Sequence, residues 1–133
     1  MAWQTRTVGD GYDDLAPDGS EIRLLPRLER ASMVHCRLGP GQVTRAVCHR
    51  TVDELWYCLS GAGQLWRRDG QAEDVVDLLP GVAVSIPVGT AFQFRAAAAG
   101  PLELLIATVP AWPGPDEAVP LDGRWTPAVR DVR

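Results

Sequence analysis

Turn-forming residues interrupt this chain about every ten positions, and that spacing constrains its fold more than any other feature. The runs between the turns are short and rich in valine, leucine, isoleucine and aromatic residues, and no window keeps a helical period. The pattern therefore predicts an all-β sandwich or barrel. Strands are expected at residues 20–25, 31–38, 43–50, 54–60, 63–68, 73–78, 82–86, 91–96 and 102–109.

Length, net charge and hydropathy pattern limit the kinds of molecule that this chain is expected to bind. A chain of 133 residues fits one domain, and its net charge of −4 argues against a nucleic-acid or anionic-membrane partner. Its first residues lack the basic start and apolar run of a signal peptide. The apolar stretch at 96–110 is broken by Gly100, Pro101 and Glu103, so it is not expected to span a bilayer.

Cysteine and arginine usage indicate the compartment and source. The three cysteines have no CxxC spacing, which favours reduced thiols and a cytoplasmic location over a zinc knuckle or a redox dithiol. All 13 basic residues are arginine, which we interpret as the coding bias of a high-GC bacterium and not as a binding signature.

The chemistry of the chain is concentrated in the segment GQVTRAVCHRTVDELWYCLSG, residues 41–61. It has the pattern of two strands joined by a short polar corner. Because residues two apart share one face of a strand, Arg45 lies on the same face as Val47 and His49. By the same rule Glu54, Trp56 and Cys58 share a face. His49 and Glu54 are therefore expected to face each other across the corner.

This segment resembles the first sequence motif of the cupins, G-x5-H-x-H-x(3,4)-E-x6-G. Gly41, His49, Glu54 and Gly61 stand in register with it, and Val47 replaces the first histidine.

The second cupin motif, G-x5-P-x-G-x2-H-x3-N, is similar to GVAVSIPVGTAFQFRA. Gly81, Pro87 and Gly89 are kept, whereas Phe92 stands at the last histidine and Ala96 at the asparagine. The resemblance spans about residues 32–109 and implies a single-domain cupin jelly-roll β-barrel. We divide the chain into an N-terminal arm and first strand (1–30), the cupin barrel (31–110) and an extended C-terminal tail covering the barrel (111–133).

Three interpretations of His49 and Glu54 remain open at this stage. The resemblance implies one divalent transition metal, held by these two residues as a partial site, with His35 as a possible third ligand. The second interpretation is a buried hydrogen-bonded pair with a structural role. The third is a metal-free active site, in which Glu54 between apolar walls has a raised pKa and exchanges a proton with His49.

Six further residues are candidates for ligand binding. Arg45 is placed to clamp a carboxylate or phosphate, or to form a rim salt bridge. Cys58 is a soft ligand, a nucleophile or a small core hydrophobe. The aromatic candidates are Trp56, Trp66, Phe92 and Phe94, which either line an apolar ligand cavity or fill the core.

Two function classes fit these residues. The first is an enzyme acting on a small organic molecule inside the barrel, with Glu54 and His49 catalytic; the fold does not choose the reaction. The second is a non-catalytic, metal-free ligand-binding cupin. The resemblance also implies a homodimer, and dimerisation would protect the edge strands of an open sandwich. The proline-rich tail, with Trp112 and Trp125, is either a packed covering segment or a lid over the barrel mouth.

Overall fold

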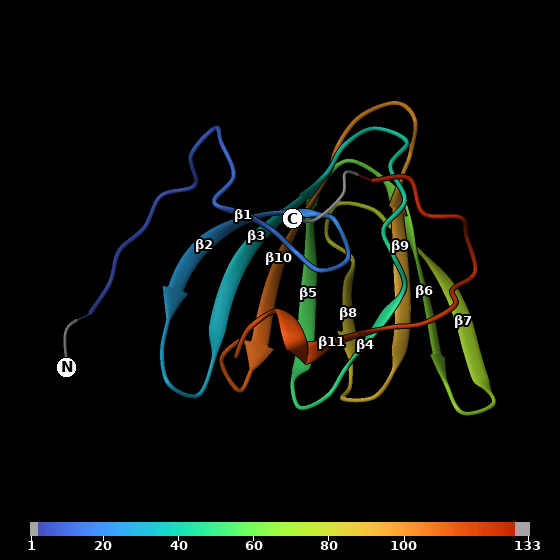
Figure 1. Ribbon diagram of the computed structural model, residues 1–133. Coiled ribbons are helices and arrows are strands. Elements are labelled where there is room, and N and C mark those ends of the chain that lie inside the picture. Colours follow the sequence, from blue (N-terminus) through green and yellow to red (C-terminus); the bar gives the residue numbers. More distant parts are fainter. Residues whose placement is uncertain (1–2, 130–133) are drawn as a thin grey trace.

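The computed structural model describes residues 3–129, which fold into two antiparallel sheets that face each other (Figure 1). Sheet A has the order β1-β2-β3-β10-β5-β8, and sheet B has the order β11-β4-β9-β6-β7. The strands are β1 (Asp14–Leu15), β2 (Glu21–Arg27), β3 (Ser32–Leu38), β4 (Val47–His49), β5 (Asp53–Ser60), β6 (Gly63–Asp69), β7 (Ala72–Leu78), β8 (Ala83–Ile86), β9 (Ala91–Ala96), β10 (Leu102–Val109) and β11 (Ala118–Pro120). This architecture confirms the all-β fold predicted from the turn spacing, and it is the jelly roll that the cupin resemblance implies.

Each of the nine expected strands is present, and one of them is much shorter than predicted. Regular pairing in the expected strand 43–50 is confined to Val47–His49. Of the preceding residues, Thr44 still bonds to β9, its N–H donating to the Phe94 carbonyl, whereas the Arg45 N–H donates to the Asp18 carbonyl. The strands β1 and β11, which were not predicted, each extend the edge of a sheet.

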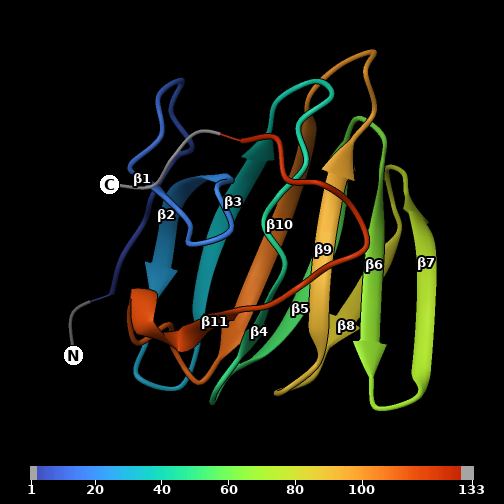
Figure 2. The ribbon, with the colours of Figure 1, turned by 45° about the vertical axis from the view of Figure 1, so that its right-hand side comes forward.

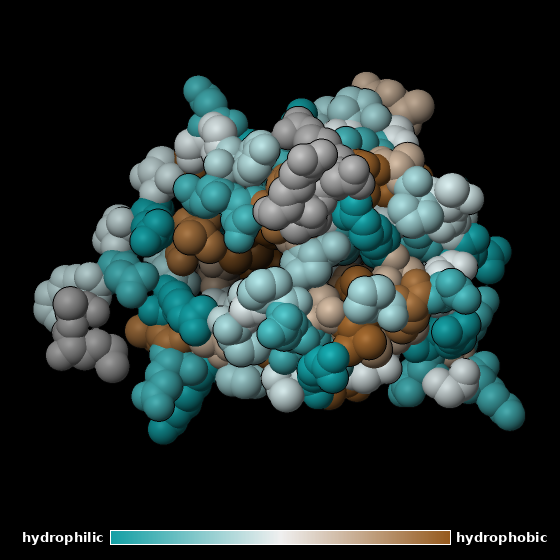
Figure 3. Space-filling view, viewed as in Figure 1, coloured by the Kyte–Doolittle hydropathy of each residue, from teal (hydrophilic) through white to brown (hydrophobic). Residues whose placement is uncertain are grey.

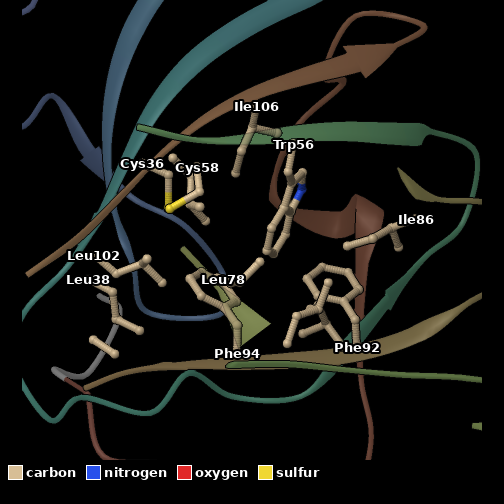
Figure 4. Packing of buried hydrophobic residues seen from close by; sticks show 14 of the residues in the cluster. Cys36, Leu38, Trp56, Cys58, Leu78, Ile86, Phe92, Phe94, Leu102 and Ile106 are labelled. Carbon is tan, nitrogen blue, oxygen red and sulfur yellow. The ribbon is translucent and has the colours of Figure 1, made fainter. Parts of the chain in front are cut away.

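The space between the sheets is filled by alternate side chains of the long strands. On β5, Glu54, Trp56 and Cys58 are buried between the sheets, whereas Leu55 and Tyr57 are exposed on the outer face. Figure 4 shows the resulting apolar core, in which the side chains of the two sheets meet. Trp56 of sheet A and Phe94 of sheet B meet edge to face within this core, with their ring centroids 4.9 Å apart.

The C-terminal segment crosses the outer face of sheet B (Figure 2). It packs Leu121 and Trp125 against a second apolar cluster formed by Ala46, Trp66 and Ala91. The amide of Gln93 fixes the crossing, because it donates to the Trp125 carbonyl and accepts from the Trp125 N–H. Both faces of β9 are therefore covered.

The N-terminal segment is joined to β2 by hydrogen bonds in addition to the short β1 pairing. Gln4 exchanges two hydrogen bonds with the backbone of Arg27, and Arg23 donates to the carbonyls of Gly9 and Asp10. Trp3 is 92% exposed at the start of this segment. Within residues 3–129, no helix is long and apolar enough to cross a membrane.

Gly61 and Gly70 give a matched test of this fold. Both have positive φ, +81° and +60°, but a Cβ at Gly61 would collide with the Pro101 carbonyl, whereas a Cβ at Gly70 meets open space. We expect Gly61→Ala to lower the free energy of unfolding by about 3 kcal/mol or more, through left-handed strain plus the clash. Gly70→Ala should cost about 1 kcal/mol, from strain alone. Equal losses in urea titrations of the two variants would contradict the close packing of residue 61 on the backbone of Pro101.

Candidate functional site

A cavity of about 180 Å³ lies between the two sheets. Its walls come from β2, β3, β5 and β10 on one side and from β4 and β9 on the other. The short strand β1 with the loop that follows it (14–18) and the tail segment 112–118 lie beside them. Most of its lining is apolar. Figure 3 shows apolar side chains at the bottom of a hollow, with hydrophilic residues around it. The cavity suits an organic ligand better than an ion.

His49 and Glu54 both line this cavity, as the alternation predicted. His49 ends β4 and Glu54 follows the start of β5, and both are about 95% buried. The imidazole Nδ1 lies 3.7 Å from the Glu54 Oε2, which is too long for a direct hydrogen bond, and Nδ1 has no other hydrogen-bond partner. The indole N–H of Trp56 donates to the Glu54 Oε1 over 2.9 Å and fixes the orientation of the carboxyl group.

The corner between these strands is held by Glu117, a residue that the sequence did not single out. Its carboxylate accepts hydrogen bonds from the Thr51 N–H (2.6 Å), the Thr51 hydroxyl (2.6 Å) and the Val52 N–H (3.0 Å). Its carbonyl accepts from the Arg50 N–H. These bonds join the tail to all three corner residues, and they lower the pKa of Glu117 despite its burial.

Two aromatic rings enclose the imidazole of His49. Phe92 and Trp112 each meet it edge-on, with ring centroids 5.2 Å away. Trp112 comes from the tail and is anchored there by its backbone: its main-chain N–H donates to the Ser32 hydroxyl, and its main-chain carbonyl accepts from the Arg27 guanidinium over 2.6 Å. The tail therefore forms one wall of the cavity.

Burial shifts the pKa values of both Glu54 and His49 toward their uncharged forms. Desolvation raises the pKa of Glu54 to about 8; the hydrogen bond from Trp56 opposes the shift, and the carboxylates of Asp18 and Glu117 add to it. Desolvation lowers the pKa of His49 to about 4, against the attraction of Glu117. At neutral pH the pair is therefore a protonated carboxyl beside an unprotonated imidazole. Asp18, also in the lining, has its pKa raised by desolvation.

The residues present do not fit a resident metal ion. Val47 and Phe92 line the cavity as apolar side chains at positions where the motif has histidines. His35, the possible third ligand, does not reach the site, which corrects that expectation. It projects from the face of β3 that points away from the cavity, and its Nε2 lies 3.5 Å from the Glu103 Oε1. Among the described residues, no three His, Cys, Asp or Glu side chains come together as a metal site. Two ligands are fewer than the three that catalytic metal sites usually have.

Two of the six ligand-binding candidates line the cavity, namely Trp56 and Phe92. Phe94 and Cys58 face inward but lie in the core beyond the cavity. Burial raises the pKa of the Cys58 thiol, which does not favour a nucleophile.

Arg45 and Trp66 do not belong to the cavity lining. Arg45 precedes the short strand β4, so alternation does not extend to it, and it lies beside Asp18 outside the cavity lining. Trp66 points to the outer face of sheet B, where the tail covers it and Arg68 stacks 5.2 Å from its ring centroid. Its burial comes from the tail and not from the interior.

Comparison with known proteins agrees with this architecture. The family model described as "Cupin domain" matches residues 34–108. KdgF from a Halomonas species aligns with a TM-score of 0.61 at 19% identity, over 83% of this chain and 88% of that one. A protein with a double-stranded β-helix domain from Klebsiella pneumoniae aligns with a TM-score of 0.65 at 14% identity, over 90% and 91%.

A larger protein contains a similar domain. Oxalate decarboxylase from Bacillus subtilis aligns with a TM-score of 0.69 at 17% identity, over 89% of this chain and 34% of its own. This chain therefore spans about a third of that enzyme. No curated protein matches the sequence significantly. At these identities the structural matches establish the fold alone.

The raised pKa of Glu54 predicts a slope in stability against pH. Between its ordinary value of 4.5 and about 8, the folded protein holds a proton that the unfolded chain releases, so rising pH favours unfolding. The His49 contribution is complete above pH 6.5, because its pKa is lowered on folding. From about pH 6.8 to 8, the free energy of unfolding should fall by about 1 kcal/mol per pH unit.

Urea titrations across this pH window measure the slope, and Glu54→Gln is its control. Glutamine keeps the shape of the side chain and cannot titrate, so most of the slope should disappear. A slope of equal size in this variant would assign the effect to another group.

Proposed function

The chain belongs to the cupin family, and from that premise we propose that it binds a small organic molecule in the cavity between its sheets, with His49 and Glu54 as a metal-free polar site. The observation that carries the proposal is the composition of the cavity wall. An apolar lining surrounds one buried imidazole–carboxyl pair, and no third metal ligand stands beside that pair among the described residues. Ligand pockets commonly combine apolar walls with a few polar groups that fix orientation.

The cavity volume suggests the size of the ligand. An engineered cavity of about 150 Å³ in another protein accommodates benzene. A cavity of about 180 Å³ therefore suits a molecule built on a single ring. Longer substituents would extend through the opening toward Leu24 and Arg27, which also belong to the lining.

The pair of polar groups also has acid–base capacity. A protonated Glu54 is a hydrogen-bond donor and a proton source near neutral pH, and an unprotonated His49 is an acceptor. In the proposed function both groups orient the ligand, and they exchange a proton with it if the protein is an enzyme. The three cysteines are free, which is compatible with the cytoplasmic location that we retain as part of this proposal.

Metal content and probe binding test the proposal together. Protein purified without added metal should contain far less than one equivalent of any transition metal. Stoichiometric metal that is lost in His49→Ala would contradict the metal-free site.

Benzyl alcohol is a suitable neutral probe of the cavity. It should shift the indole N–H resonance of Trp56, and Val34→Phe should weaken its binding at least tenfold, because Val34 lines the cavity. Val75→Phe, on the exposed outer face of β7, is the control and should bind normally. Unchanged binding by Val34→Phe would place the probe elsewhere.

We also propose that two copies of the chain form a homodimer through the outer face of sheet A. Met33, Leu55, Tyr57, Leu105 and Ala107 lie together on the adjacent strands β3, β10 and β5 and line a shallow depression. Met33, Leu55 and Tyr57 are each more than a third exposed. None of the five is charged, so a second copy of the same face buries them without burying a charge.

The mass in solution tests the homodimer. Light scattering should give twice the 14.4 kDa chain mass, and Leu55→Arg should shift it toward the monomer by placing a charge in the interface. Val75→Arg, on an exposed part of sheet B, should leave the mass unchanged. A monomeric wild-type protein at micromolar concentration would refute the dimer.

A further inference from the structure

The charges around the cavity are mostly of one sign. Asp18 and Glu54 both belong to its lining, and the carboxylate of Glu117 lies close enough to His49 and Glu54 to influence both their pKa values. The charged groups that influence Glu54 are Asp18 and Glu117, and both raise its pKa. No positive charge is among the causes of that shift.

The two arginines near the cavity, Arg45 and Arg27, interact with groups other than Glu54. Arg45 lies beside Asp18 and offsets part of its charge, but it is not in the cavity lining. Arg27 is in the lining at an exposed position, and its guanidinium donates to the Trp112 carbonyl. The acid that stays ionised near the interior end of the cavity is Glu117, because its pKa is lowered. Glu54 can in addition release its proton when a cation lies beside it.

Aromatic rings surround the same space. Trp56, Phe92 and Trp112 all line the cavity. Trp56 belongs to sheet A and Phe92 to the opposite sheet B. Rings of this kind attract a cation through the negative potential of their faces, most strongly where water is excluded. His49 stands among them, 5% exposed, with Nδ1 unpartnered.

From these contacts we propose that the ligand of this cavity is a small organic amine bound as its ammonium ion, with the ammonium group beside Glu54 and its apolar part against Trp56, Phe92 and Trp112. The ammonium supplies the positive charge that an ionised Glu54 lacks in the free protein. Burying an ammonium ion is costly unless a carboxylate pairs with it, and this cavity offers that partner. A carboxylate ligand instead adds a negative charge near Glu117, whose lowered pKa keeps it ionised, and is therefore disfavoured. This inference rests on the proposed function, since it assigns the ligand class of the same cavity.

Three probes of nearly equal size separate charge from shape. Benzylamine, benzyl alcohol and benzoate share one ring and are cationic, neutral and anionic at pH 7. We expect benzylamine to bind at least tenfold more tightly than benzyl alcohol, and benzoate at least tenfold more weakly, by calorimetry. Benzylamine should also reverse the shift that benzyl alcohol causes in the Trp56 indole N–H resonance. Such competition would place both probes in the cavity.

Variants then assign the preference to the carboxyl group. Glu54→Gln should reduce the advantage of benzylamine over benzyl alcohol to less than threefold, because glutamine cannot carry the charge that pairs with an ammonium ion. Glu73→Gln, which removes an exposed carboxylate paired with Arg124, should keep the full advantage. The comparison of the three probes on the wild-type protein stands even if Glu54→Gln fails to fold.

The outcomes distinguish the two claims. If benzyl alcohol binds in the cavity and benzylamine is no tighter, or if benzoate is tightest, the amine assignment is wrong while the cavity remains a ligand site. If none of the three shifts the Trp56 resonance, both the amine assignment and the proposed function are wrong.

Discussion

The loss of water around Glu54 is the constraint on which the properties of this site depend. The carboxyl group lies between two packed sheets, its one strong hydrogen bond comes from the Trp56 indole, and its nearest charged neighbours are acids. In such an environment the neutral form is favoured, and His49 is held neutral by the same desolvation. Replacement of two motif histidines by Val47 and Phe92 is consistent with this environment, because both side chains add apolar surface where a metal site would need donors.

The C-terminal segment completes the site from outside the family match, which ends at residue 108. Glu117 binds the corner that separates His49 from Glu54, and Trp112 supplies a cavity wall against His49. β11 adds the last pairing, between Ala118 and His49 itself. A small cupin core alone would leave this end of the cavity open, so the tail belongs to the proposed binding site as much as the motif strands do.

The sequence predicted the parts of this structure that depend on local pattern. Turn spacing located the nine main strands, and alternation on β5 placed Glu54 and Trp56 inside. It could not locate Glu117, because this residue acts on Thr51 from 66 positions away. Nor could it orient Trp66 or His35: each is buried on an outer face, Trp66 under the C-terminal tail and His35 beside Arg23, which the N-terminal segment covers. Burial there reflects covering segments and not the interior of the sandwich.

The central claim is that an apolar cavity keeps the carboxyl of Glu54 protonated beside a neutral, metal-free His49. The most direct measurement is an NMR titration of the Glu54 side-chain ¹³C carboxyl resonance in protein stripped of metal and then dialysed against zinc. The account predicts a midpoint near pH 8 that zinc does not change. A midpoint at or below the ordinary value for glutamate, or a large shift on adding one equivalent of zinc, would contradict it.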